Sequence, residues 1–158
     1  MRYQISKKWM VAGMLTLVVM CGSMVYSHCQ IPCGIYGDST RFDILSEHIT
    51  TIEKSMKQIN ELSAAKQPNM NQVVRWVQNK EKHTDEINHI VTYYFMAQRI
   101  KPADAGTEGY AAYVKKVTLL HQMLVYTMKA KQTTDLDHIA TLRDLLGQFH
   151  VAYAGHSH

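Results

Sequence analysis

Apolar residues recur every three or four positions along four stretches of the chain, the spacing of one face of an α-helix. The first stretch predicts a helix over about residues 40–65, with candidate N-caps at 38–40 and apolar positions at Leu45, Ile49, Ile52, Met56, Ile59 and Leu62. The second predicts a helix over about 71–99, bounded by Pro68 and Pro102.

A loop over residues 101–109 separates this pair from two further helical patterns. The third pattern begins at Tyr110, and the fourth runs from Leu136 to Phe149 after possible caps at Thr133 and Thr134. Four amphipathic helices with short connections predict an all-α fold, an antiparallel (up-down) four-helix bundle over residues 38–158.

Composition agrees with one compact domain of this kind. The 158 residues are 46% hydrophobic and 19% charged, with only 3 Pro and 8 Gly. Those values exclude general disorder and disfavour a turn-dense all-β chain.

The N-terminal segment does not belong to the bundle. Arg2, Lys7 and Lys8 precede 18 uncharged, mostly apolar residues, Trp9 to Tyr26. This order predicts a cleavable leader over residues 1–27 that ends at Ser27. The alternative is a retained membrane anchor, because 18 residues just suffice to span a bilayer.

Charge argues against nucleic acid as a partner. The formal net charge is +4, but removal of residues 1–27 takes away three cations and no acid, which leaves +1. A nearly neutral mature chain lacks the broad basic surface of a nucleic-acid-binding protein.

Residues 28–37 form a short segment with no helical period, which predicts a hook or loop. Cys29 and Cys33 can face one ion, since Pro32 restricts the backbone and Gly34 permits a tight turn. Cleavage after residue 27 would also free the α-amine of His28, whose ordinary pKa near 7.7 lets a metal displace its proton at little cost.

These donors predict a planar metal site. The amine of His28, the amide nitrogen that joins it to Cys29, and the thiolates of Cys29 and Cys33 make a set of two nitrogens and two sulfurs, with the His28 imidazole as a possible axial ligand. Such a set favours Ni(II) or Cu(II) over Zn(II), and nickel over copper because Cu(II) oxidises thiolates. A one-electron redox catalyst is the expected function.

A different class of function remains open at this point. Two cysteines close together in an exported chain commonly form a disulfide. With Cys29 and Cys33 joined, the chain would be an exported non-enzymatic helical bundle that acts as a binding or metal-carrier module.

The string His28-Cys29-x-x-Pro32-Cys33-Gly34-x-Tyr36 resembles the nickel-binding hook of the nickel-containing superoxide dismutase family. The resemblance implies disproportionation of superoxide to dioxygen and hydrogen peroxide by Ni(III)/Ni(II) cycling. It implies one nickel ion per subunit, a homohexamer of four-helix subunits, and a maturation protease that exposes the hook.

The same resemblance implies roles for single residues. His28, Cys29 and Cys33 would be the metal ligands, and Tyr36 would line the access channel and orient water or superoxide. Asp43 would hold the axial imidazole in the second shell, with Glu47 as a competing candidate. The arginine that completes this shell in other members has no obvious counterpart, and His83 lies nearest to its place.

The leader also bears on localisation. It resembles an export signal, which predicts a periplasmic or secreted protein. The alternative is a cytoplasmic enzyme whose pro-segment is removed, as in soluble members of the family that it resembles.

Overall fold

The structure is a computed structural model that describes residues 37–155. The predicted leader, the hook residues 28–36 and the last three residues lie outside this described range. Within it the chain forms four α-helices, one π-helix and no strand. The elements are α2 (Asp38–Ser63), α3 (Met70–His89), the π-helix η1 (Ile90–Arg99), α4 (Tyr110–Gln132) and α5 (Asp137–Ala154).

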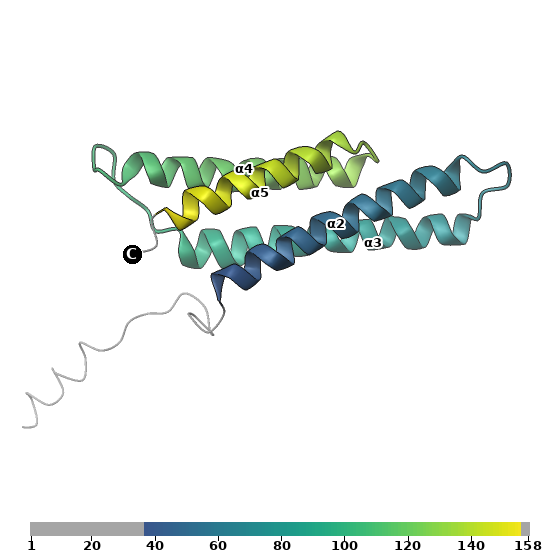
Figure 1. Cartoon of the computed structure of the whole chain (residues 1–158), viewed down its shortest axis with the longest axis horizontal. Coiled ribbons are helices and arrows are strands. Elements are labelled where there is room, and N and C mark those ends of the chain that lie inside the picture. The colour runs from purple at the N-terminus through teal and green to yellow at the C-terminus, as the bar shows by residue number, and fades with distance from the viewer. Residues whose placement is uncertain (1–36, 156–158) are drawn as a thin grey trace, which may run out of the picture. The chain divides into compact units, whose positions relative to one another are not determined.

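Two helical hairpins build the described fold. The helices α2 and α3 lie side by side, as do α4 and α5 (Figure 1). The two hairpins then pack together through contacts of α2 with α5 and of α3 with α4. The all-α prediction is confirmed, and the arrangement is compatible with the expected bundle.

The core lies between the hairpins and follows the predicted stripes on α2 and α5. In α2 the positions Leu45, Ile49, Ile52 and Met56 are fully buried, while Leu62 is only half-buried. On α4 the pattern is less informative, because its apolar residues surround the helix. The residues of the core with no exposed surface are Leu45, Ile49, Ile52, Met56, Ile87, Val91, Phe95, Leu120, Met123, Ala130, Leu142 and Phe149.

The helix starts differ from the predicted caps. The helix α2 begins at Asp38 itself, with Gly37 as N-cap and no side-chain cap. For α5 the N-cap is Leu136, and Asp135 rather than a threonine accepts a hydrogen bond from the backbone N–H of Asp137 at 3.0 Å. At α5 a carboxylate thus takes the place of the predicted hydroxyl, since both kinds of oxygen accept from free N–H groups.

The second predicted helix is not α-helical throughout. Ten of its residues, Ile90–Arg99, form the π-helix η1, in which backbone bonds join residues five apart. Periodicity of apolar residues did not predict this change. The wider turn is compatible with the same buried face, since Ile90, Val91, Tyr94 and Phe95 are all buried.

A buried lysine ties the two hairpins together at the end of α4. Lys80 of α3 is 3% exposed, and its ammonium donates hydrogen bonds to the carbonyl oxygens of Ala130 at 2.8 Å, Thr133 at 3.3 Å and Lys131. The carbonyls of Ala130 and Lys131 belong to the last turn of α4 and that of Thr133 to its C-cap, where no helical N–H is left for them. The lysine therefore acts as the C-terminal cap of another helix.

Lys80→Met is expected to lower the free energy of unfolding by about 2–3 kcal/mol, because one buried and two partly buried carbonyls lose a charged donor. Chemical denaturation followed by circular dichroism measures this loss. The matched control is Lys57→Met, which removes an exposed pair with Glu53 and should cost no more than about 0.5 kcal/mol. Equal losses in the two variants would contradict the capping role.

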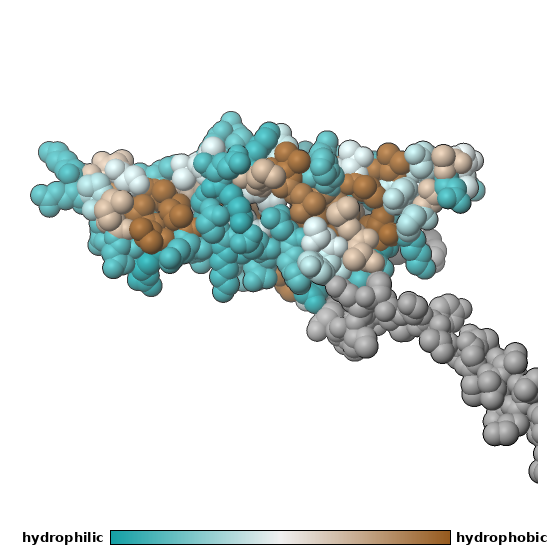
Figure 2. Space-filling view, turned by 180° about the vertical axis from the view of Figure 1, so that it is seen from behind, coloured by the Kyte–Doolittle hydropathy of each residue, from teal (hydrophilic) through white to brown (hydrophobic). Residues whose placement is uncertain are grey.

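The surface of the described bundle is mainly polar, with apolar patches on the face seen in Figure 2. Large apolar side chains that remain exposed include Met70, Val74 and Val77 along one side of α3, at 61%, 49% and 37%. Among residues 37–155, no helix is both long and apolar enough to cross a membrane.

Candidate metal centre

The predicted metal ligands His28, Cys29 and Cys33, and the predicted channel residue Tyr36, all lie outside the described residues. What the structure places is the part of the chain that follows them directly, the start of α2 at Asp38. Within residues 37–155, no group of three or more His, Cys, Asp or Glu side chains is arranged to hold a metal ion. The hook ligands therefore stay a prediction from the sequence.

A polar cluster of Asp38, Tyr94, Arg99 and Tyr153 surrounds the first residue of α2. One carboxylate oxygen of Asp38 accepts from the Tyr94 hydroxyl at 2.5 Å, and the other accepts from the Tyr153 hydroxyl at 2.8 Å. The guanidinium of Arg99 lies 2.8 Å from the first oxygen and donates to the Tyr94 hydroxyl at 3.0 Å. We call these four residues the Asp38 cluster.

The Asp38 cluster favours the ionised carboxylate. Partial burial raises the pKa of Asp38, but the hydrogen bonds from Tyr94 and Tyr153 and the charge of Arg99 outweigh it, so this pKa lies below its ordinary value. Burial and the bond to Asp38 raise the pKa of both tyrosines. Both hydroxyls thus stay protonated donors at neutral pH.

No pattern in the sequence predicts this cluster. Along the chain, Tyr94 lies 56 positions and Tyr153 115 positions after Asp38. From the sequence, Asp38 is predicted only to be a candidate helix cap. No local spacing predicts the cluster, because only packing of η1 and α5 against the start of α2 brings the groups together.

Asp43, the predicted second-shell residue, is an exposed side chain of α2. It makes no hydrogen bond or ion pair with other residues of the described range, and it lines a shallow pocket with Arg143 and His150. Five residues separate it from Asp38, which places the two carboxylates about 140° apart around the helix. The structure therefore does not bring Asp43 into the Asp38 cluster.

His83 faces another histidine. Its Nδ1 lies 2.8 Å from Nδ1 of His48 across the α2–α3 pair, so that one ring donates and the other accepts. Burial and the neighbouring His83 lower the pKa of His48, which favours the neutral ring at this contact. In this structure His83 thus makes a helix–helix contact with α2.

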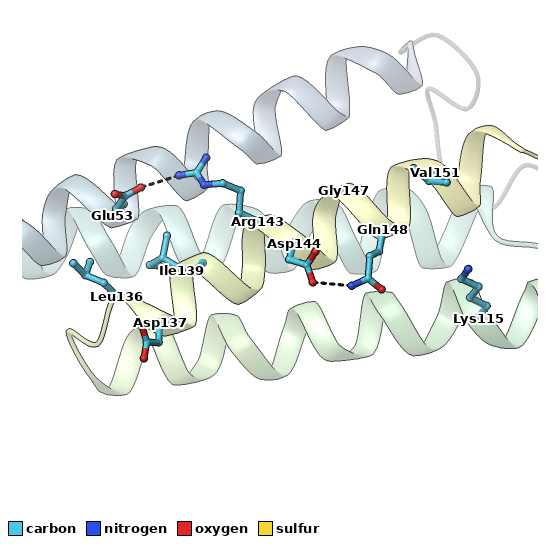
Figure 3. Close-up of a pocket in the computed structure, with 11 residues that line it drawn as sticks. Glu53, Lys115, Leu136, Asp137, Ile139, Arg143, Asp144, Gly147, Gln148 and Val151 are labelled. Carbon is cyan, nitrogen blue, oxygen red and sulfur yellow. Dashed lines mark hydrogen bonds and ion pairs between the residues drawn. The ribbon is translucent and has the colours of Figure 1, made fainter.

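A groove lies along α5 and has a volume of about 940 Å³ (Figure 3). Its walls mix apolar residues such as Leu136 and Val151 with charged ones. On one side Arg143 of α5 donates to Glu53 of α2 at 2.8 Å. The groove contains neither histidine nor cysteine, so we assign no metal to it.

A helical domain that follows a segment of nitrogen and sulfur donors is compatible with the class of redox metalloproteins. The family model of nickel-containing superoxide dismutase matches residues 23–157, nearly all of the chain outside the leader. The chain therefore belongs to the nickel-containing superoxide dismutase family. No curated protein and no solved structure matches it.

Family membership establishes the activity and the cofactor. The protein is an oxidoreductase that disproportionates superoxide, and nickel is its metal. Membership of this family does not support the alternative of a non-enzymatic module closed by a disulfide. The donors in residues 28–33 fit the metal, because amine, amide and thiolate groups suit a planar nickel site.

Proposed function

We propose that His28, Cys29 and Cys33 hold the nickel ion of this superoxide dismutase after removal of residues 1–27. The supporting observation is the string His28-Cys29-x-x-Pro32-Cys33-Gly34-x-Tyr36, which lies within the range matched by the family model. The terminal amine and imidazole of His28, the amide nitrogen of Cys29 and the thiolates of Cys29 and Cys33 would be the donors that hold the nickel ion.

Nickel, when bound, supplies the exchange of one electron with each of two superoxide ions in turn. Two superoxide ions and two protons then yield one dioxygen and one hydrogen peroxide. The protein's part is to orient the anion and deliver protons. We assign this role to Tyr36, whose hydroxyl would donate a hydrogen bond to water or superoxide beside the metal site.

Asp43 is proposed as the partner of the axial imidazole. A carboxylate that accepts from the second ring nitrogen of a metal-bound histidine sets its orientation and raises its basicity. The exposed position of Asp43 leaves its carboxylate available to residues outside the described range. Glu47, also exposed and one helical turn further along α2, remains the competing candidate.

The finer architecture is also proposed: an antiparallel bundle over residues 38–158 behind a hook over 28–37, assembled as a homohexamer. The exposed stripe of Met70, Val74 and Val77 supports self-association, because monomers rarely expose contiguous apolar surface without a partner. The positions recur at intervals of four and three, so they share one side of α3.

Residues 1–27 are proposed to be an export leader, which would place the mature enzyme in the periplasm or outside the cell. A maturation protease that cuts after Ser27 would expose His28. Retention as a membrane anchor, and cytoplasmic location after pro-segment removal, are the alternatives. The mass of the natural chain distinguishes a retained leader from a removed one.

The test of the proposed centre combines the N-terminus, metal content and thiol titration of the purified natural protein. We expect a chain that begins at His28 with one nickel per subunit. After removal of the metal under anaerobic conditions, two free thiols should titrate. A Cys29–Cys33 disulfide in an active enzyme, or nickel bound to a chain with a blocked His28 amine, would contradict the proposed ligands.

A further inference from the structure

The π-helix η1 and the Asp38 cluster occur at the same place. Tyr94 and Arg99 both belong to η1 and are five residues apart. In an α-helix, residues five apart lie about 140° from each other around the axis. The wider turn of a π-helix brings such residues to one side, and here the Arg99 guanidinium lies over the Tyr94 ring at 5.0 Å and bonds its hydroxyl.

The irregular helix therefore places Tyr94 and Arg99 on the side of η1 where the cluster forms. With α-helical geometry, Tyr94 and Arg99 would start from sides of the helix about 140° apart. The π conformation is rare and is found frequently at functional sites, because its loss of regular packing needs a compensating gain. In this protein the visible gain is a carboxylate held by two hydroxyls and a guanidinium from two other elements, η1 and α5.

The position of Asp38 in the chain links the cluster to the hook. Asp38 comes two residues after Tyr36 and five after Cys33. A fully extended chain spans at most about 3.6 Å per residue, so the few intervening residues limit how far the predicted ligand segment can extend from Asp38. Covalent geometry alone thus ties the predicted ligand segment to this carboxylate.

We propose that Asp38 is a positioning residue for the nickel centre. By holding the carboxylate, Tyr94, Tyr153 and Arg99 fix the point where the hook enters α2, and so set the placement of Cys33 and Tyr36 relative to the metal. This proposal rests on the ligands assigned under the proposed function. The proposal gives a role at the metal centre to residues of α2, η1 and α5. None of these residues is a proposed metal ligand.

A simpler explanation is that Asp38 only stabilises the start of α2. An acidic residue in the first turn of a helix contributes about 0.3–1 kcal/mol through the helix dipole. That effect requires no partner side chains and would not change the metal centre. The two explanations therefore differ in what a substitution does to nickel and not only in what it does to stability.

The test uses the nickel-loaded, fully processed enzyme with Asp38→Asn and, separately, Tyr153→Phe. Asparagine keeps the shape of the side chain and loses its charge. Phenylalanine removes one hydrogen bond and keeps the ring that packs near Phe95 and Phe149 at 5.6 and 5.7 Å. Because Tyr153→Phe retains this packing, it decides the question if Asp38→Asn does not fold.

We expect each variant to bind nickel but to react with superoxide about tenfold more slowly, since small displacements of reacting groups can cost up to about 100-fold. The electron paramagnetic resonance spectrum of the oxidised enzyme should shift or broaden. A wild-type rate and spectrum in both variants, with or without a loss of thermal stability, would overturn the proposal.

Glu53→Gln is the matched control. Its carboxylate also joins α2 to α5, through the bond from Arg143 at 2.8 Å, but it lies fifteen residues further along α2. This variant should keep the wild-type rate and spectrum. If it slowed the reaction as much as Asp38→Asn, any loosening of the α2–α5 contact would explain the effect, and the positioning role would be wrong.

The same preparations separate this proposal from the ligand assignment. Failure of the ligands would appear in the unsubstituted enzyme, as a blocked His28 amine or a disulfide between Cys29 and Cys33. Failure of the positioning role would leave that enzyme as expected and appear only as unchanged kinetics and spectra in the Asp38→Asn and Tyr153→Phe variants.

Discussion

Cys33→Ser is expected to abolish superoxide dismutation, and Cys29→Ser should do the same. Each substitution replaces a thiolate by a hydroxyl that stays protonated at neutral pH and is a poor donor to nickel. The loss should exceed the roughly 10- to 100-fold effect of altering an outer-shell partner of a metal ligand. Pulse radiolysis of the purified variants measures the rate, and elemental analysis measures bound nickel.

The chain offers its own control in Cys21, which lies in the predicted leader. Cys21→Ser should yield a mature enzyme identical to the wild type, because processing removes the altered residue. Dismutation that persists at the wild-type rate in either Cys29→Ser or Cys33→Ser would place the active metal at some other site.

Insertion of one alanine between Ser27 and His28, with cleavage kept at its original place, is expected to be nearly as damaging. The nitrogen of His28 would then be an amide instead of an amine whose ordinary pKa is near 7.7. The new amine would lie one residue too far away to form the same chelate ring. Intact mass verifies the extension, and absorption spectra with the superoxide rate report the centre.

His28→Gln separates the two roles of this residue. It keeps the terminal amine, and hence the planar donors, but removes the imidazole. We expect nickel to remain bound while turnover slows, because an axial nitrogen favours the oxidised metal. A His28→Gln enzyme with the wild-type rate would refute the axial role of the imidazole. For the alanine insertion, an extended chain with full activity would show that the terminal amine is not a ligand.

The helices were predictable because their information is local. The stripes of α2 and α5 place their apolar residues toward the core at the expected positions, and predicted helix limits agree with the structure to within a few residues. The change to a π-helix at Ile90 was not predictable. It changes which side chains lie on the same side of the helix, but the apolar residues still fit an α-helical spacing in the sequence.

The candidate site also has one part that the sequence predicts and one part that only the tertiary structure shows. The hook string spans nine residues, so the chemistry of its nitrogens and sulfurs can be interpreted without any tertiary contact. The Asp38 cluster joins residues up to 115 positions apart. Such a cluster has no periodicity and no fixed spacing, and the predicted carboxylate, Asp43, lies on a different side of α2.

From its sequence alone this chain is an all-helical protein whose short N-terminal segment carries donors suited to nickel, because helical period and donor chemistry both reside in neighbouring residues. Tertiary structure alone decided which carboxylate is held at the entrance of α2, and how. That choice depends on the packing of α5 and of a π-helix against one helix terminus, and packing between distant segments leaves no local pattern.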